Sequence, residues 1–340
     1  MRFIHVGVGG FGRVWVNLLH NTPWAEVVAL VDVNEEALAA AREVGGYSAD
    51  ICHSSLAAAL AATDADVLVC TTPPRFHRAD VVAALEAGLH VISEKPMADT
   101  LEDCIAMVRA ARDTGRTYAV SQQYRYSPAM WTLAQTLRDS DLGAVGQVKM
   151  DFFKGHNFGG GFRHEMPYPL IIDMSIHHFD LTRFLTGLDA VRVTASSWNP
   201  PWSNYAGDCS STVLLEMDNG ARLLYNGSWC AKGTWCDWNG NWQIECERGT
   251  VTYANGEIRR LAVPELYAVT SDEVIPHVEP ELQGQSHVLH DFRDAIAAGH
   301  KPKTDCTDNL RSVAMVFATV EAMKTGHTID ILTPEIRELL

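Results

Sequence analysis

The N-terminal segment constrains the fold of this chain more than any other part. A short apolar run, Phe3-Ile4-His5-Val6, leads directly into the stretch Gly7-Val8-Gly9-Gly10-Phe11-Gly12, and a helical pattern starts at Arg13. Glycines spaced as G-x-G-x-x-G let the backbone turn tightly, approach a pyrophosphate closely and pack a helix against a strand. The helix start then offers N–H groups and a positive dipole end to phosphates. This context predicts a dinucleotide-binding turn over residues 7–12.

An acidic residue at the end of the next apolar run supports this prediction. Asp32 follows the run Val27–Val31, at the spacing of roughly 20 residues after the last glycine that is typical of a ribose-binding carboxylate. A carboxylate there accepts hydrogen bonds from the ribose hydroxyls and repels a 2′-phosphate. The following Val33-Asn34 supplies no arginine to receive such a phosphate. The cofactor we expect is therefore NAD in preference to NADP.

Charge and composition disfavour several classes of partner. The 340 residues include 27 Lys and Arg against 42 Asp and Glu, a net charge of −15. Such a balance disfavours nucleic-acid phosphates and anionic membrane surfaces. The first strand pattern begins too early to leave room for a signal peptide, and no apolar stretch reaches the roughly 18 residues of a membrane span. We therefore expect a cytoplasmic protein with no nucleic-acid or membrane partner.

Strand and helix patterns alternate through the first 120 residues. Continuous apolar runs such as Val67–Cys70 are typical of strands buried on both faces, and helical patterns such as Ala79–Ala87 separate them. This alternation predicts an α/β domain with a doubly wound parallel sheet over residues 1–121. Beyond it, helical patterns at 129–138 and 170–185 precede a region of strands and turns.

In the second part of the chain, residues 122–340, the strand and helix patterns predict an α+β domain. Alternating strand patterns separated by turn signals run from 191 to 269 and indicate an antiparallel sheet. Two helical patterns, 287–298 and 307–325, follow. Six tryptophans lie between 198 and 242. They are typical of sheet packing or a subunit interface, with one or two expected near a substrate as a platform for sugar rings.

A lysine follows the strand pattern His90–Ser93 in the motif Glu94-Lys95-Pro96. In a doubly wound sheet, ligands bind beyond the carboxyl ends of the strands. Lys95 is therefore predicted to project into the cofactor crevice, where a partly desolvated ammonium group can bind a substrate hydroxyl and stabilise its oxyanion. A surface lysine at a strand end is the plain alternative.

A carboxylate and an imidazole share one predicted helix, in Asp173-Met174-Ser175-Ile176-His177. Positions i and i+4 of an α-helix lie on one face, about 6 Å apart. The carboxylate can then hold the tautomer of His177 and raise its basicity, which suits a general base. His178 is rotated by about 100° and faces elsewhere. The alternative is a core histidine or a helix-face ion pair.

The loop before this helix carries His156, Arg163 and His164, which either reach a polyhydroxy substrate or are solvated. A metal site requires three or four convergent ligands. The adjacent histidines diverge on a helix, and the eight cysteines include no C-x-x-C pair. We therefore expect no metal, and we interpret the cysteines as reduced thiols that mostly pack in the core.

These motifs together resemble the glucose–fructose oxidoreductase, inositol dehydrogenase and MocA family of NAD(P)-dependent sugar and polyol dehydrogenases. The similarity runs nearly end to end. Its marks are the glycine motif, Thr72-Pro73-Pro74-x-x-His77, Ala87-Gly88-Leu89-His90-Val91 leading into Glu94-Lys95-Pro96, Gln123-Tyr124-Arg125-Tyr126, and Asp173-x-x-x-His177. In two places the chain departs from the family pattern: Gln123 replaces the usual asparagine, and Pro74 stands where asparagine is common.

The resemblance implies a Rossmann domain followed by a domain with a large open-faced, mostly antiparallel sheet, through which dimers or tetramers form. It implies that Lys95, Asp173 and His177 carry the reaction, with His177 as the base. It also places further residues around the cofactor, namely Thr71, Thr72, Pro73, His77, Glu94 and Gln123.

The function expected from these observations is oxidation of a secondary hydroxyl of a sugar, sugar derivative or cyclitol by hydride transfer to NAD. Lys95 and His177 would both bind the reacting hydroxyl, and His156 and Arg163 would contact the substrate. Two alternatives remain open. One is an NAD-dependent glycosidase of related architecture, and the other is a dinucleotide-binding regulator without catalysis.

Overall fold

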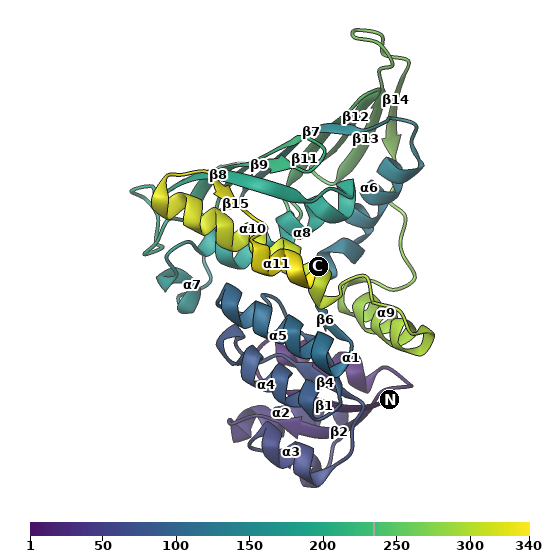
Figure 1. Ribbon diagram of the computed structural model, residues 1–340, viewed down its shortest axis with the longest axis vertical. Helices are drawn as coiled ribbons and strands as arrows, with labels where there is room; N and C mark the ends of the chain where they lie inside the picture. Colours follow the sequence, from purple (N-terminus) through teal and green to yellow (C-terminus); the bar gives the residue numbers. More distant parts are fainter. Residues whose placement is uncertain (234) are drawn as a thin grey trace. The chain divides into compact units, whose positions relative to one another are not determined.

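The computed structural model describes residues 1–233 and 235–340, which form two compact units (Figure 1). The first unit contains residues 1–123, 284–310 and 338–340, and the second contains residues 124–283 and 311–337. The chain thus leaves the first unit shortly after the boundary expected at residue 121 and later returns to it twice.

The first unit contains a six-stranded sheet in which every pairing is parallel. Its order is β3-β2-β1-β4-β5-β6, so the winding reverses between β1 and β4. This topology confirms the doubly wound parallel sheet predicted from the sequence. The strands are β1 (Arg2–Val6), β2 (Glu26–Val31), β3 (Cys52–His53), β4 (Val67–Cys70), β5 (His90–Ser93) and β6 (Tyr118–Val120).

Five helices connect these strands, and local capping residues set their ends. Asn34, Ser55 and Thr100 each accept a backbone N–H at a helix start, which satisfies donors that the helix leaves open. One boundary differs from the expectation: α4 begins at Pro74 rather than near Ala79, because proline is favoured in the first helical turn. The helices are α1 (Gly12–His20), α2 (Glu35–Gly45), α3 (Leu56–Ala62), α4 (Pro74–Glu86) and α5 (Leu101–Thr114).

A helix from late in the sequence completes the core of the first unit. Leu289 and Phe292 of α9 (Gly284–Ala298) belong to the same buried cluster as Phe3, Trp15 and strand residues of β4 to β6. The backbone N–H of Val120 also donates to the carbonyl of Thr304, at 3.0 Å. Residues 284–310 are therefore an integral part of this unit.

The second unit contains a nine-stranded, mostly antiparallel sheet in the order β14-β13-β12-β11-β7-β10-β9-β8-β15. The pair β7 and β10 is parallel. Figure 1 shows α6 (Pro128–Asp139), α8 (Ser175–Thr186) and α10 (Cys306–Thr325) on one face of this sheet. The strands are β7 (Val145–Phe153), β8 (Ala190–Trp198), β9 (Ser210–Met217), β10 (Arg222–Ser228), β11 (Asn241–Cys246), β12 (Gly249–Ala254), β13 (Glu257–Ala262), β14 (Ser271–Ile275) and β15 (Ile329–Asp330).

Besides the short helix within the loop that carries Arg163, three elements of the second part were not expected from the sequence. Strand β14 lies beyond the expected strand region. Strand β15 follows the helix expected to end the chain, as does α11 (Pro334–Leu339). Short strands and single-turn helices carry too few residues to show a period. The antiparallel sheet itself confirms the prediction for this region.

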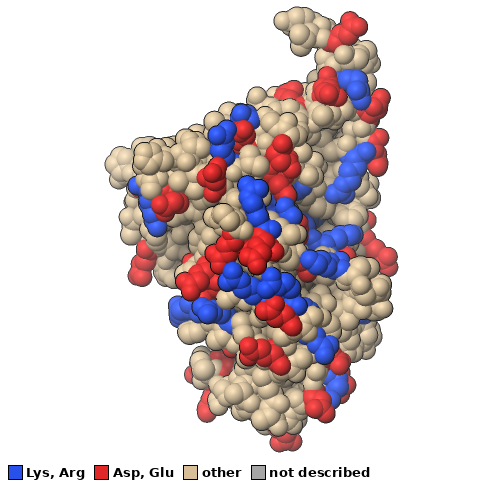
Figure 2. All heavy atoms as spheres, in the orientation of Figure 1, with Lys and Arg blue, Asp and Glu red and all other residues tan. Residues whose placement is uncertain are grey.

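The surface carries both signs of charge. Acidic and basic side chains are interspersed over the face in Figure 2. Several form exposed ion pairs, such as Arg192 with Glu216 on β8 and β9 and Arg259 with Asp272 on β13 and β14. A search of the described residues for a helix with the length and apolarity to cross a membrane finds none.

Two fully buried histidines predict that stability depends on pH. Burial lowers the pKa of His5 and of His178 from 6.5 to about 3. At pH 5 both rings are therefore neutral in the folded chain and protonated in the unfolded chain. Because the unfolded state then binds more protons, the free energy of unfolding decreases as the pH falls below about 6.5. Each ring contributes about 1.4 kcal/mol per pH unit until its folded-state pKa is reached.

We expect thermal melting midpoints to decrease from pH 7 to pH 5, and a His178→Asn variant to show a shallower dependence. His300 is exposed, so His300→Gln is the matched control and leaves the dependence unchanged. Differential scanning calorimetry at several pH values measures this. Equal midpoints at pH 7 and pH 5 would contradict the assignment of neutral buried rings.

Candidate active site

Two glycines of the turn after β1 are required by packing within the protein. Gly7 has φ +86°, and a Cβ added there would lie 2.6 Å from the backbone nitrogen of Thr72. A Cβ on Gly12 would lie 1.9 Å from the carbonyl oxygen of Gly7. Any side chain at these positions would push the turn away from β4 or from α1. These glycines therefore serve the close packing expected from the motif.

Of the other two glycines, Gly10 faces open space and Gly9 lies in tight contact with Ala37 only. A Cβ on Gly9 would come no closer than 3.3 Å to another atom, the Cβ of Ala37, and one on Gly10 would meet nothing within 4 Å. Helix α1 begins after Phe11 without a side-chain cap and without an acidic residue in its first turn. An open glycine surface beside an uncapped helix start fits the pyrophosphate of a dinucleotide.

A buried chain of hydrogen bonds from His5 through Thr71 to Gly7 holds this turn in place. The Thr71 hydroxyl lies 2.6 Å from the carbonyl oxygen of Gly7, to which it donates, and 2.9 Å from Nε2 of His5. Since the hydroxyl hydrogen points to Gly7, Nε2 of His5 carries the proton and donates to Thr71. The chain ties the end of β4 to the end of β1.

Asp32 lies directly beside the glycine turn. Its Oδ2 accepts a hydrogen bond from the backbone N–H of Gly9 at 3.2 Å, and its Oδ1 accepts one from Asn34 at 2.9 Å. The carboxylate is thus held at the end of β2, next to the surface that fits a pyrophosphate. This is the arrangement that ribose recognition requires.

His77 connects the loops that follow β4 and β5. It is completely buried in α4, with Nε2 2.7 Å from the carbonyl oxygen of Thr72 and Nδ1 3.0 Å from that of Met97. Burial lowers the pKa of His77. The Thr72 hydroxyl donates to Asp80 at 3.0 Å. The side chain of His77 therefore positions the Thr72-Pro73 backbone.

Glu94 anchors the loop that carries Lys95. Its Oε1 accepts from the indole N–H of Trp15 at 2.8 Å, and its Oε2 accepts from the backbone N–H of Lys95 at 3.2 Å. The pKa of Glu94 is raised, mainly because the carboxyl group is buried. Lys95 itself is half-buried, and the Lys95–Pro96 peptide bond is cis.

A buried amide that the sequence analysis missed follows β6. Among the described residues, neither Nε2 nor Oε1 of Gln122 has a hydrogen-bond partner, and the same holds for Oε1 of Gln123. Buried amides without partners are rare and costly, so such groups are candidates for contact with a ligand. Only Gln123 was expected, because the family pattern marks that position.

The second unit places Asp173 in a turn wider than an α-helix. Residues Leu170–Met174 form one π-helical turn, and α8 begins at Ser175. The α-helix expected from residue 170 therefore begins only at Ser175, and Asp173 lies in the π-helical turn that precedes it. Turns of this kind are frequent at functional sites. Oδ2 of Asp173 accepts from Nε of Arg163 at 2.6 Å.

His177 is buried in α8 and stacks on Tyr124. The two ring centres lie 4.0 Å apart, and the ring planes differ by 10°. Burial, with added effects of Asp173 and Asp237, raises the pKa of Tyr124 to about 12. Tyr124 is therefore a neutral phenol at physiological pH, and its ring fixes the plane of the imidazole. Tyr124 lies inside the Gln123–Tyr126 motif, but the motif alone assigns it no role.

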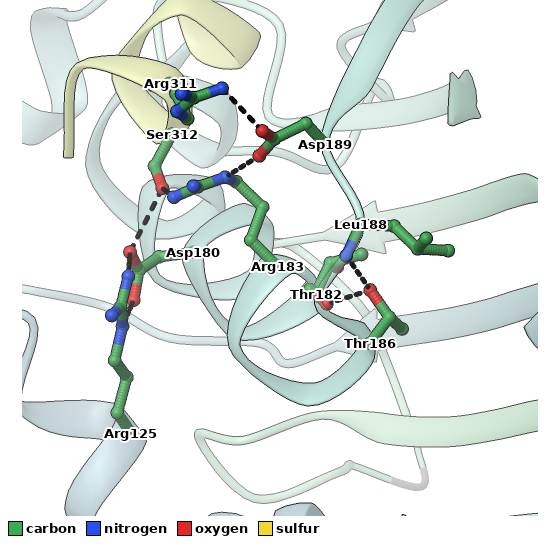
Figure 3. Close-up of polar contacts among 9 residues, drawn as sticks. All are labelled: Arg125, Asp180, Thr182, Arg183, Thr186, Leu188, Asp189, Arg311 and Ser312. Atoms are coloured by element: carbon green, nitrogen blue, oxygen red, sulfur yellow. Dashed lines mark hydrogen bonds and ion pairs between the residues drawn. The ribbon is translucent and has the colours of Figure 1, made fainter. Parts of the chain in front are cut away.

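A buried ion pair fixes α8 to its neighbours (Figure 3). Arg125 donates to Asp180 through Nε at 2.6 Å and through Nη2 at 2.5 Å, and the Ser312 hydroxyl donates to the same carboxylate at 3.0 Å. Loss of either charged partner would leave an uncompensated buried charge. The pair joins the segment after β6 to α8 and α10, so it positions the helix that carries His177.

The loop expected to contact substrate contains a short helix, α7 (Phe162–Glu165), and an array of rings. The Phe158 ring lies 4.4 Å from that of His156 and 5.1 Å from that of Trp229. The His164 ring packs against Tyr205 at 4.8 Å.

The six tryptophans divide by exposure. Trp229 and Trp242 are buried and pack in the core. The other four are at least one-third exposed, namely Trp198, Trp202, Trp235 and Trp238. The eight cysteines are free thiols. The described residues contain no group of three or more His, Cys, Asp or Glu side chains arranged to hold a metal ion.

The chain matches known proteins over nearly its whole length. Residues 1–122 match the oxidoreductase family with an NAD-binding Rossmann fold, and residues 130–252 match the GFO/IDH/MocA C-terminal domain. A protein of unassigned activity from Sinorhizobium fredii, y4oX, is 29% identical over 97% of this chain and 95% of its own length. A D-apiose dehydrogenase from Paraburkholderia graminis is 27% identical over 97% of this chain and 89% of its own length.

A solved structure shows the same fold. An oxidoreductase from Agrobacterium radiobacter, in complex with NAD+, L-tartaric acid and magnesium, superimposes with a TM-score of 0.86. The alignment covers 97% of this chain and 98% of that one, at 22% identity. At this identity the likeness concerns the fold.

Proposed function

Since the chain belongs to the GFO/IDH/MocA family of NAD-binding oxidoreductases, we propose that it oxidises a secondary hydroxyl of a sugar, sugar derivative or cyclitol. The observation that carries this proposal is the oriented imidazole of His177. Its plane is fixed by the neutral ring of Tyr124, and Asp173 is held in the preceding turn by Arg163. A buried, oriented imidazole suits removal of a proton from a hydroxyl group.

The residues of the first unit fit a dinucleotide. In the proposal, backbone N–H groups at residues 9–12 hold the pyrophosphate, and Asp32 accepts hydrogen bonds from the ribose hydroxyls. Thr71, Thr72, Pro73, His77, Glu94, Lys95 and Gln123 complete the surroundings of the cofactor. When bound, NAD supplies the hydride acceptor.

Five side chains divide the work on the substrate. Lys95 donates a hydrogen bond to the reacting hydroxyl and stabilises the negative charge that develops on its oxygen. A ring nitrogen of His177 takes the hydroxyl proton as the carbon loses its hydride. Asp173 balances the positive charge that His177 acquires, and His156 and Arg163 orient the remainder of the substrate.

The proposal also covers the oligomeric state of the protein and its location in the cell. We expect a cytoplasmic homodimer or homotetramer that forms through the nine-stranded sheet. Leu214 and Leu224 support this, because they are cross-strand partners on β9 and β10 and both are exposed. Exposed apolar pairs on an open sheet face are typical of subunit contacts.

A substrate panel tests the proposed reaction. Inositols, aldoses, anhydrosugars and sugar acids are incubated with NAD or NADP, and NADH formation is followed by absorbance. We expect NADH with at least one class. Hydrolysis of a glycoside without net NADH would favour the glycosidase alternative. Binding of NAD without reduction across the panel would favour a regulator.

The proposed binding of the ribose hydroxyls by Asp32 can be tested through the preference for NAD over NADP. Replacing Asp32 with serine and Val33 with arginine removes the repulsion of a 2′-phosphate and adds a charged donor. Val33 is 90% exposed, so its replacement costs little packing and leaves the Asn34 cap of α2 intact. We expect the ratio of kcat/KM for NAD over NADP to fall by about 100-fold. Val33→Arg alone is the control, and an unchanged ratio in the double variant would contradict ribose binding by Asp32.

A further inference from the structure

The guanidinium group of Arg163 is fixed by its neighbours in the second unit. Its Nε donates to Oδ2 of Asp173 at 2.6 Å. Its Cζ lies 4.9 Å from the ring centre of Phe158 and 4.6 Å from that of Phe162. The side chain is 31% exposed, so one part of it is reachable from solvent. An arginine held in this way has lost most of its rotational freedom before any ligand arrives.

The end of this guanidinium is available to a ligand. Within the described residues, neither terminal nitrogen of Arg163 donates a hydrogen bond, because its polar partner, Asp173, accepts from Nε. Two parallel N–H groups on a planar guanidinium match the two oxygens of a carboxylate. The neighbouring residue His164 also has a buried ring nitrogen, Nε2, that finds no hydrogen-bond partner among the described residues.

We propose that Arg163 binds a carboxylate group of the substrate, so that the enzyme acts on a sugar acid or a related hydroxy acid. This inference rests on the proposed function and specifies its substrate class. The carbon skeleton would pack on the half-buried rings of Phe158 and His156, whose centres are 4.4 Å apart. The buried ring of Trp229 supports that of Phe158 at 5.1 Å. Aromatic rings of this kind favour contact with the C–H faces of sugars.

The local charges favour a carboxylate over a phosphate. The positive charge of Arg163 is already partly balanced by Asp173, which accepts a hydrogen bond from its Nε. A single guanidinium that already pairs with one carboxylate can accept one further negative charge more easily than the two charges of a phosphate monoester. Sugar phosphates are therefore a comparison in the test.

The experiment compares matched pairs of neutral and acidic ligands. D-glucose is paired with D-glucuronate, and D-galactose with D-galacturonate. D-gluconate, L-tartrate and galactose 6-phosphate complete the set. Dissociation constants are measured by calorimetry on the full chain in the presence of NAD, and kcat/KM is measured separately. We expect at least one acid to bind at least about 10-fold more tightly than its neutral partner.

Variants at Arg163 give the second arm. Arg163→Gln is expected to weaken acid binding by about 10- to 100-fold and to weaken the binding of neutral ligands by a clearly smaller factor, because Arg163 also holds Asp173. Arg163→Lys keeps the charge without the fork, and we expect an intermediate loss. Arg192→Gln removes an exposed arginine on β8 and is the matched control, with no change. Melting curves verify that each variant is folded.

The outcomes separate this inference from the proposed function. Acids that bind no better than neutral partners, an equal loss for both classes in Arg163→Gln, or preference for the phosphate would each overturn the carboxylate site. NADH formation from neutral sugars in that case would leave the proposed oxidoreductase intact. Conversely, Arg163-dependent binding of acids with no NADH from any ligand would support the site and contradict the proposed reaction.

Discussion

We expect His177→Ala to lower kcat by about 100- to 10,000-fold, because the variant lacks the group proposed to take the hydroxyl proton. Alanine leaves the Tyr124 ring without its stacking partner, while the cofactor turn lies in the other unit and retains its contacts. NAD affinity, measured by quenching of tryptophan fluorescence, is therefore expected to stay near the wild-type value. Added imidazole is expected to restore part of the turnover.

Lys95→Ala tests the second group of the same proposal. Loss of a donor to a developing oxyanion is expected to lower kcat by about 100- to 1,000-fold. Lys95→Arg keeps the charge but changes its shape, so we expect little recovery. His300→Gln changes an exposed histidine and serves as the control for both variants. Wild-type turnover in either alanine variant on a true substrate would contradict the assignment of these residues.

The second large effect is expected from the glycine turn. Replacing Gly12 is expected to lower the stability of the fold, whereas replacing Gly9 is expected to lower the affinity for NAD. In Gly12→Ala the new Cβ would lie 1.9 Å from the carbonyl oxygen of Gly7. Helix α1 must therefore move, and we expect a loss of about 3 kcal/mol or more in the free energy of unfolding. In Gly9→Ala the nearest atom is Cβ of Ala37 at 3.3 Å, so stability is expected to change by less than about 1 kcal/mol.

For Gly9→Ala the loss is expected in binding. The methyl group would press on Ala37 and lie 3.7 Å from Oδ2 of Asp32, which would shift the turn and the carboxylate that the proposal assigns to the pyrophosphate and the ribose. We therefore expect NAD affinity to fall by about 100-fold or more. Calorimetric melting and NAD titration on the same preparations measure the two properties independently. A Gly9→Ala variant that binds NAD like the wild type would show that the dinucleotide does not lie on this turn.

The sequence predicts most of the first unit because its signals are local. Continuous apolar runs mark strands buried on both faces, and Asn34, Ser55 and Thr100 cap helices whose starts the pattern locates closely. The start of α4 was predicted too late, because its first turn has a weak apolar period and because a proline such as Pro74 is common both in loops and in the first turn of a helix.

The arrangement of the candidate site was less predictable, because it depends on residues far apart in the chain. Arg125 and Asp180 are separated by 55 positions, and no spacing rule indicates such a pair. The stacking of Tyr124 on His177 likewise requires the fold. The π-helical turn at Asp173 changes the helical period locally, whereas a periodicity argument assumes a constant one. These contacts position the residues that the motifs had identified.

The late contribution of α9 to the first unit has a consequence for synthesis of the chain. A ribosome releases β1 to β6 long before Leu289 and Phe292, which share a buried cluster with Phe3 and Trp15. Until those two side chains emerge, one side of the nascent sheet keeps apolar surface in contact with water or with a chaperone. Vectorial folding of the nucleotide-binding half therefore stays incomplete until most of the polypeptide has been translated.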